Sequence, residues 1–430
     1  MKTIPVHASG GWKRRAFLKT IALTLPAMPI LRPSLRAAEP GEKLPPIRAI
    51  TRGPKFHWRG YYDKQLFDPT NRFVLANQVD FAGRSPVAGD VIQVGMIDTQ
   101  DQDRWIELGE SRAWNWQQGC MLQWLPGSTS ELIWNDLVDN QFVCHVLNVK
   151  SGKKRTLPHP VYCLSPDGRW GVAPDFRRLN DTRPGYGYAG LPDPNASDLA
   201  PESAGIWRMD MQTGKHELLF SFAHAAKIPY PGGFSNNAKH WFNHLLFNTD
   251  GCRFLFLHRW RGDKEGKSWS TRMFTMNPDG SDWYILDPHG KTSHFVWRDA
   301  KHVMAWAWHP SNGERFYLYR DHTDQVEVVG KDVMTVNGHN TYVPGTNDQW
   351  VLNDTYPDKQ RLQHPYLFHI PTERRVPLGH LLSPKEFQGE WRCDTHPCAS
   401  RDGKRVCLDS THEGGRQVYL VDIEAIIARG

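Results

Sequence analysis

The chain has 430 residues, of which 39% are hydrophobic and 12% aromatic, and it includes 36 Gly and 18 Trp. This composition indicates a turn-rich protein that is long enough for one large β domain. The first 38 residues hold seven Lys or Arg and no acid, which accounts for the formal net charge of +6. The remaining 45 basic and 46 acidic residues nearly cancel. Net charge therefore excludes the usual argument for a nucleic-acid partner.

Residues 1–38 resemble a twin-arginine export signal. The pair Arg14-Arg15 stands before an apolar stretch, residues 17–31, that is too short and too rich in proline to span a membrane. Lys13 takes the place of the usual Ser or Thr, and cleavage near Ala37-Ala38 is expected. The resemblance implies a periplasmic or secreted protein with no transmembrane segment after signal removal. The alternative is a basic start followed by a buried hydrophobic strand.

The seven cysteines stand singly along the chain, apart from Cys393 and Cys398. An odd count without regular spacing does not form a disulfide framework. Because twin-arginine substrates cross the membrane already folded, reduced cysteines and a metal loaded in the cytoplasm would both be compatible with export.

Seven segments combine a turn with a β-rich run. In most of them an apolar inner strand precedes the turn, and a third and a fourth strand follow. Four-stranded units repeated radially predict an all-β fold, a seven-bladed β-propeller, over residues 39–430. A β-sandwich is the rival, but seven similar units argue against it. The segments are FDPTNRFVLAN (67–77), LPGSTSELIWND (125–136), LSPDGRWGVAPD (164–175), FNTDGCRFLFLH (247–258), WRDAKHVMAWAW (297–308), VPGTNDQWVLND (343–354) and ASRDGKRVCLDS (399–410).

The last unit shows the pattern most clearly. Its expected strands are residues 394–399, 405–409 and 417–422, and an Asp402-Gly403 turn joins the first two. This arrangement would place Cys393, His396 and His412 at one end of the blade. We also expect a strand near residues 47–52 to complete this blade and close the ring.

Two long connections give the first indication of function. They follow the second strands of the third and fourth blades, at about residues 176–205 and 259–270, and both would lie on one face. Long loops in compact domains are usually functional or disordered. The first contains Arg177, Arg178 and Arg183, which could clamp carboxylates; ordinary loop solvation and packing is the alternative.

Histidines recur at the start of four consecutive inner strands. Counting back from each turn gives His244, His294, His339 and His396 at equivalent positions in blades four to seven. Inner strands line the channel, so these imidazoles should converge and could hold a divalent transition metal, zinc or manganese. The alternative is a set of hydrogen-bonded channel residues. Cys393 is a further candidate ligand or else a small buried hydrophobe.

The seven-bladed pattern, the channel histidines and the phrase Thr395-His396-Pro397 resemble the oligogalacturonate lyases, and the ulvan lyases are similar in style. Both families cut uronic-acid polysaccharides by β-elimination, and the resemblance covers most of residues 45–425 as a pattern. It implies a manganese-like ion with His396 and His339 as ligands. Cys393 stands where that family has a ligand Gln, and a thiolate would favour zinc. The histidines near the family's other catalytic or ligand positions are His244 and His294.

Elimination on a uronate requires a cation that neutralises charge on the carboxylate, a base and an acid. The predicted partner is thus a uronic-acid oligo- or polysaccharide. A non-catalytic propeller of the cell envelope, which binds or acts as a scaffold, is the alternative. A glycoside hydrolase is less well supported, because facing carboxylates are not evident. The candidate residues are His244 and His258 as base or acid, Tyr188 as acid, Arg177, Arg178 and Arg183 as carboxylate clamps, His294, His339, Cys393 and His396 as metal ligands, and Trp114, Trp116, Trp260 and Trp269 as sugar-stacking groups.

Overall fold

The computed structural model describes residues 43–262 and 268–429. All of them belong to one compact unit, residues 34–430. The expected export signal, residues 1–38, lies outside the described residues. No helix among the described residues is long and apolar enough to cross a membrane.

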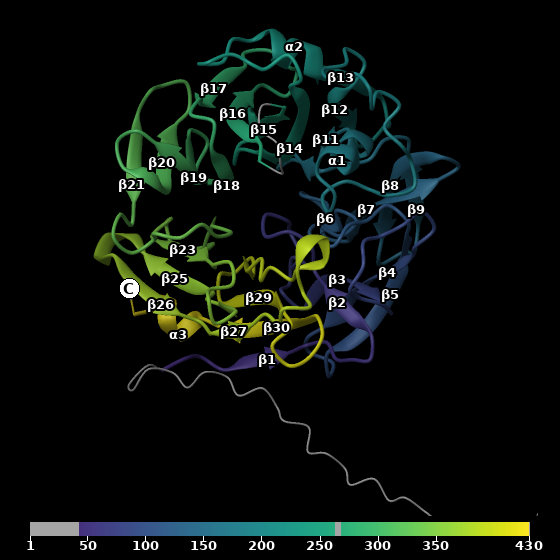
Figure 1. Cartoon of the computed structure of the whole chain (residues 1–430). Coiled ribbons are helices and arrows are strands. Elements are labelled where there is room, and N and C mark those ends of the chain that lie inside the picture. Colours follow the sequence, from purple (N-terminus) through teal and green to yellow (C-terminus); the bar gives the residue numbers. More distant parts are fainter. Residues whose placement is uncertain (1–42, 263–267, 430) are drawn as a thin grey trace, which may run out of the picture. The chain divides into compact units, whose positions relative to one another are not determined.

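Seven four-stranded antiparallel sheets follow one another around a ring, as Figure 1 shows. This confirms the predicted seven-bladed β-propeller. The first four blades are β2 (Phe56–Trp58), β3 (Phe73–Val79), β4 (Ile92–Asp98) and β5 (Arg104–Ser111); β6 (Gln123–Trp124), β7 (Glu131–Val138), β8 (Gln141–Asn148) and β9 (Lys154–Leu157); β10 (Cys163–Leu164), β11 (Trp170–Pro174), β12 (Gly205–Asp210) and β13 (His216–Ser221); and β14 (Lys239–Phe247), β15 (Phe254–Arg261), β16 (Ser270–Met276) and β17 (Tyr284–Asp287).

The later blades keep the same order, with one addition in blade six. There a separate two-stranded sheet, β24 with β27, stands beside the four main strands. The strands are β18 (Thr292–Trp297), β19 (His302–His309), β20 (Gly313–Arg320) and β21 (Val326–Val329); β22 (Thr341–Tyr342), β23 (Trp350–Asn353), β24 (Leu362–Gln363), β25 (Tyr366–His369), β26 (Arg374–Pro377) and β27 (Leu381–Leu382); and β28 (Cys398–Ala399), β29 (Arg405–Ser410) and β30 (Gln417–Asp422).

The seventh blade is completed from the other end of the sequence. Strand β1 (Ile47–Ala49) pairs with β30 in antiparallel register, Ile47 opposite Val421 and Ala49 opposite Tyr419. The expected closing strand is thereby confirmed, and the blade's outer edge is paired rather than open. The inner strand β28 is much shorter than expected, because His396 adopts a φ of +40° that a regular strand does not allow.

The repeated Asp-Gly turns also join neighbouring blades. Gly168 and Gly403 have φ values of +72° and +70°, which glycine adopts without steric cost. A Cβ on Gly403 would lie 2.1 Å from the carbonyl oxygen of Pro344, and one on Gly168 would lie 2.3 Å from that of Pro126. The turn that defines the repeat in sequence is therefore also a close contact with the preceding blade.

Apolar clusters fill the spaces between blades, and tryptophan dominates the first of them. Trp58, Trp114, Trp116, Trp124 and Trp134 are all buried in the cluster shared by blades one and two. The indole N–H groups of Trp114 and Trp116 donate to backbone carbonyls at 3.0 and 2.8 Å. These two tryptophans are therefore core residues rather than sugar platforms.

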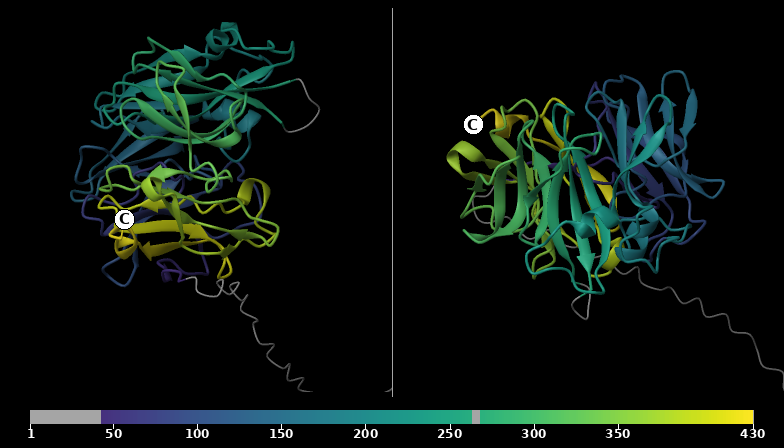
Figure 2. Two further views of the ribbon diagram at one scale, coloured as in Figure 1. Left: turned by 90° about the vertical axis from the view of Figure 1, so that its left-hand side faces the viewer. Right: turned by 90° about the horizontal axis from the view of Figure 1, so that it is seen from above.

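Helical segments are short and lie in the connections. Asp175 caps the first, and its carboxylate accepts from two backbone N–H groups, so the long loop of blade three begins as a helix rather than as irregular chain. Ile426 and Ile427 of the last helix pack against the cluster of blades six and seven, at the edge where Figure 2 places the C-terminus. The helices are α1 (Phe176–Thr182), α2 (Phe222–Lys227), η1 (Ile370–Thr372), η2 (Gly389–Trp391) and α3 (Glu424–Ile427).

Candidate functional site

The four channel histidines do come together. The ring centroids of His294 and His339 lie 4.1 Å apart, and those of His339 and His396 lie 4.3 Å apart. His244, aimed by a β-bulge in β14 where its φ is +52°, stacks on Tyr61 at 5.1 Å. Tyr61 also meets the edge of His396 at 4.9 Å. The histidines thus form one group with a tyrosine from the connection that follows β2.

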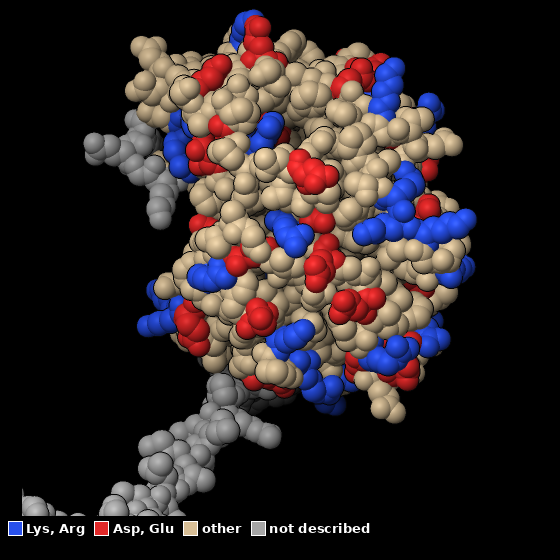
Figure 3. Space-filling model, turned by 90° about the vertical axis from the view of Figure 1, so that its right-hand side faces the viewer, with Lys and Arg blue, Asp and Glu red and all other residues tan. Residues whose placement is uncertain are grey.

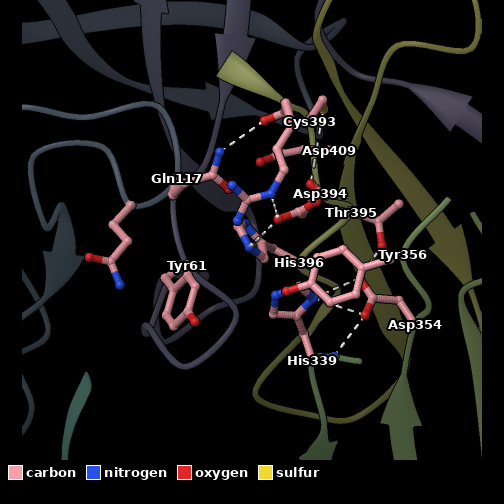
Figure 4. Close-up of polar contacts among 12 residues, drawn as sticks. Tyr61, Gln117, His339, Asp354, Tyr356, Cys393, Asp394, Thr395, His396 and Asp409 are labelled. Carbon is pink, nitrogen blue, oxygen red and sulfur yellow. Dashed lines mark hydrogen bonds and ion pairs between the residues drawn. The ribbon is translucent and has the colours of Figure 1, made fainter. Parts of the chain in front are cut away.

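Within this group, His339, Asp394 and His396 offer ligand atoms that all lie within 4.8 Å of one another. Figure 4 shows the three side chains converging from blades six and seven. The Nε2 atoms of both histidines and Oδ1 of Asp394 are buried, and none has a hydrogen-bond partner among the described residues. Unpartnered buried polar atoms are costly unless something binds them. Two imidazoles and a carboxylate fit a divalent transition metal.

The second nitrogen of each ligand histidine is already occupied. His339 Nδ1 lies 2.9 Å from an Asp354 carboxylate oxygen, and His396 Nδ1 lies 2.9 Å from the carbonyl oxygen of Gly60. A proton on each Nδ1 satisfies both contacts and leaves Nε2 as a free acceptor. Metal-binding histidines are commonly fixed by such outer contacts. The other oxygen of Asp394 accepts from Arg392 Nε at 2.8 Å.

A buried arginine holds the backbone that carries His396. Arg59 is 1% exposed, and its Nε donates to Asp409 at 3.0 Å. Its Nη2 donates to the carbonyl oxygens of Thr395 and His396 at 3.0 and 2.7 Å. These contacts join the first blade to the last and support the positive φ of His396.

Two predicted ligands lie outside the ligand group. The Cys393 thiol has a single long contact among the described residues, 4.0 Å to the Asp394 carbonyl oxygen, and burial raises its pKa to about 12. Cys393 therefore lies outside the ligand group, and the argument for zinc that rested on its thiolate loses its geometric basis. His294 Nδ1 lies 3.0 Å from Asn337 Oδ1, and its Nε2 lies 3.4 Å from the Tyr356 hydroxyl. Sequence reasoning missed Asp394, although a residue two before His396 can share its face in an extended segment.

A cavity of about 930 Å³ opens next to the ligand group. Residues from blades three to seven line it, and both long connections noted in the sequence contribute to that lining. A cavity of this volume accommodates a drug-sized or oligosaccharide ligand. Its polar and aromatic lining includes Arg183, Tyr186, His244, Arg259, Arg261, Trp269, Lys291, His294, Asn337, Tyr356, Glu390 and Arg392.

The two histidines of the cavity are neutral at ordinary pH. Burial lowers the pKa of His244 well below 6.5, and the nearby Arg259 lowers it further. Burial and His339 have the same effect on the pKa of His294. Neutral imidazoles can accept protons or hydrogen bonds but add no positive charge to the cavity.

Tyr186 and Arg259 have unusual protonation properties that the sequence did not reveal. Burial alone would raise the pKa of Tyr186, but the charges of Arg392 and Arg183 outweigh it and lower that pKa below 10. Arg392 Nη2 donates to the Tyr186 hydroxyl oxygen at 2.7 Å. Burial and the charge of Arg183 lower the pKa of Arg259 to about 9. Only the folded connections bring these groups together, so no sequence motif could have identified them.

Arg178 is a structural brace rather than a carboxylate clamp. Its side chain has 0% exposure and pairs with Asp193 at 3.1 Å. It also donates to the carbonyl oxygens of His240, Asn195 and Leu199. These bonds fix the long connection of blade three to blade four. All three guanidinium nitrogens of Arg178 thus donate hydrogen bonds within the protein.

The other predicted residues fall into two groups. Arg183 does line the cavity, whereas Arg177 pairs with its neighbour Asp175 at 2.8 Å and faces a separate pocket of about 200 Å³. Tyr188 is fully buried, stacks on Phe176 at 4.1 Å and accepts a hydrogen bond from Asn135. The predicted roles of Tyr188 and Arg177 therefore lose their geometric basis, as that of Arg178 does.

His258 is likewise enclosed. It has 0% exposure, and its two ring nitrogens lie 2.8 Å from His240 Nδ1 and 3.0 Å from Arg272 Nε. Trp260, in the same strand, is 2% exposed. A side chain so placed stabilises blade four and has no access to a substrate, because β15 directs it into the blade rather than into the cavity.

Comparison with known proteins gives a fold relationship. No protein-family model matches the chain, and no curated protein matches its sequence. An oligogalacturonate lyase solved in complex with manganese superposes with a TM-score of 0.64 at 13% identity, covering 90% of this chain and 96% of that one. An oligogalacturonate lyase from Vibrio parahaemolyticus gives 0.60 at 13% identity, covering 89% and 96%. At such identity the likeness shows a shared propeller fold.

Proposed function

We propose that the protein is a metal-dependent lyase that cleaves a uronic-acid glycan, oligogalacturonate-like or ulvan-like, by β-elimination. The observation that carries this proposal is the set of three unpartnered ligand atoms beside a cavity lined by arginines and neutral histidines. The fold shared with two oligogalacturonate lyases, one of them in complex with manganese, supports it. The twin-arginine-like segment at residues 1–38 supports export to the periplasm or beyond as part of the same proposal.

His339, Asp394 and His396 would hold the ion. A divalent cation there would stabilise negative charge that develops on the uronate carboxylate. Arg259, 3% exposed and with unpartnered buried Nε and Nη1 atoms, would bind that same carboxylate from the cavity wall.

Tyr186 and Tyr356 supply the proton transfers. The Tyr186 phenolate, stabilised by Arg392, takes the proton on the carbon next to the carboxylate. The electrons of that C–H bond form the new double bond, and the bond to the 4-linked oxygen breaks. Tyr356 donates a proton to the departing oxygen, while His294 lies 3.4 Å from its hydroxyl and keeps it oriented. No water is consumed, and solvent exchange restores both tyrosines.

The first test uses purified protein on a panel of uronic-acid polysaccharides and oligomers, with and without a chelator. We expect an ultraviolet absorbance from the unsaturated uronate product, which the chelator abolishes and added Mn²⁺ or Zn²⁺ restores. Absence of product on every substrate, together with no bound metal, would instead support the non-catalytic envelope propeller.

The role of Tyr186 predicts a specific pH dependence. The pKa of Tyr186 lies below 10, so its phenolate is populated at a lower pH than that of an ordinary tyrosine. We therefore expect kcat/KM to rise as the pH increases through this lowered pKa. Tyr186→Phe should remove this rising limb and lower kcat by about 10²- to 10⁴-fold, with metal content unchanged. An unaltered pH profile in the variant would assign the base to another residue.

A further inference from the structure

Three arginines gather around one tryptophan in the cavity wall. The guanidinium carbons of Arg183, Arg259 and Arg261 lie 4.2, 5.7 and 5.8 Å from the centre of the Trp269 ring. Arg183 comes from the long connection of blade three, and the other two arginines come from the end of β15. Attraction to the negative face of the indole helps to hold these cations together.

Within the part of the chain that the structure describes, no ion pair with an acidic residue neutralises this arginine cluster. Among residues 43–262 and 268–429, none forms an ion pair with Arg183, Arg259 or Arg261, and each has a buried Nε without a hydrogen-bond partner. Two acids of the cavity wall pair with lysines instead: Asp181 binds Lys239, and Glu314 binds Lys291. The third, Glu390, forms no ion pair among the described residues. Burial and the charge of Arg183 also lower the pKa of Arg261.

The distribution of charge in the arginine cluster differs from that on the outer surface. On the side formed by blades one to three, basic and acidic side chains are interspersed, as Figure 3 shows. The arginine cluster instead concentrates positive charge inside the cavity. Such focusing attracts anionic ligands and strengthens their binding.

One carboxylate cannot satisfy the whole cluster. A carboxylate carries a single negative charge and accepts about four hydrogen bonds, whereas three guanidiniums bring three charges and far more donors. Arg259 and Arg261 are two residues apart on one strand, so they point to the same side with Cα atoms about 7 Å apart. Arg259 is the deeper of the two, and Arg261 is partly exposed nearer the mouth of the cavity.

We propose that Arg183 and Arg261, backed by Trp269, bind a second oxyanion on the sugar next to the one whose carboxylate Arg259 holds. This inference rests on the proposed function for the identity of the first sugar. The ligand class is a glycan with a negative group on two adjacent sugars, either carboxylate on both or carboxylate beside sulfate ester. Arg183 covers one face of the indole, so Trp269 orients the guanidiniums rather than stacking on a sugar ring there.

Calorimetric titration of the intact protein tests this second subsite without any turnover. The probes are galacturonate, tetragalacturonate and a tetrasaccharide that alternates uronate with a sulfated neutral sugar, each with the metal removed by chelation. For at least one tetrasaccharide, Arg261→Met should weaken binding by about tenfold to a hundredfold, the loss of one charge-assisted contact. Binding of the monosaccharide should change by less than about twofold. Arg261→Lys should recover part of the loss.

Arg104→Met is the matched control, because it removes an exposed charge on β5 at the outer edge of blade one. It should leave all affinities unchanged. Dependence on Arg261 with tetragalacturonate identifies a second carboxylate, and dependence only with the sulfated probe identifies a sulfate. Equal losses for monosaccharide and tetrasaccharides, or no loss for any, would overturn the proposal. Tight Arg261-dependent binding without any unsaturated product would contradict the lyase activity but not the second subsite. Turnover together with binding that does not depend on Arg261 would contradict the second subsite but not the lyase activity.

Discussion

Replacing His339 by alanine is expected to abolish metal binding and to lower kcat/KM by about a thousandfold or more. His339 contributes one of three buried atoms that have no hydrogen-bond partner among the described residues, and the residue as a whole is 1% exposed. The measurement is metal content by atomic emission together with the rate of unsaturated product formation. Circular dichroism checks that the propeller remains folded.

Two further variants make this result specific. Asp354→Asn keeps the shape of the outer contact but weakens the hold on His339 Nδ1, so metal affinity should fall by about 10- to 100-fold. His294→Ala should retain the metal, because both nitrogens of His294 contact other partners and its atoms are outside the ligand group. Retention of a full metal complement by His339→Ala would contradict the assignment of the ligands.

Replacing Arg178 by methionine should destabilise the protein by about 3–5 kcal/mol while leaving substrate KM nearly unchanged. The substitution leaves Asp193 buried without its ion partner and frees three backbone carbonyls from the arginine. Urea unfolding and KM of the folded fraction measure the two effects.

Arg177→Met is the matched control, because it makes the same substitution at the neighbouring position in the sequence. Arg177 is the adjacent residue, but its side chain is 37% exposed, so the same substitution should change stability by less than about 1 kcal/mol. A stable Arg178→Met protein with a strongly raised KM would instead support a substrate-binding role for Arg178.

The fold was predictable because its signals are local. Each blade repeats a short turn and an alternating strand, and the Asp402-Gly403 turn marks its hairpin within a few residues. Counting back from such turns also found His339 and His396, since equivalent positions of inner strands face one channel. The closing strand was predictable for a different reason, because a propeller leaves one edge of its last blade to be paired.

The site's chemistry was less predictable because it depends on distant contacts. Gly60, whose carbonyl fixes His396, is 336 residues away in sequence. Arg177, Arg178 and Arg183 look alike in sequence, yet only Arg183 lines the cavity. What separates them is how the connection after α1 folds back to enclose Arg178. Cys393 resembled a ligand by its place three residues before His396, but the structure groups Asp394 with His339 and His396 instead.

The ligand group lies beside the joint at which the ring closes, because Asp394 and His396 belong to the blade that β1 completes. His396 is held by Gly60, Arg59 bridges to Asp409, and β1 completes the blade that carries both. The contacts that hold His396 therefore form only when residues 394–422 meet residues 47–60. An ion that binds only the closed ring at a thousandfold excess over Kd would add about 4 kcal/mol against opening. A metal bound there would then stabilise the closed ring against opening, and the metal content of the protein would report ring closure.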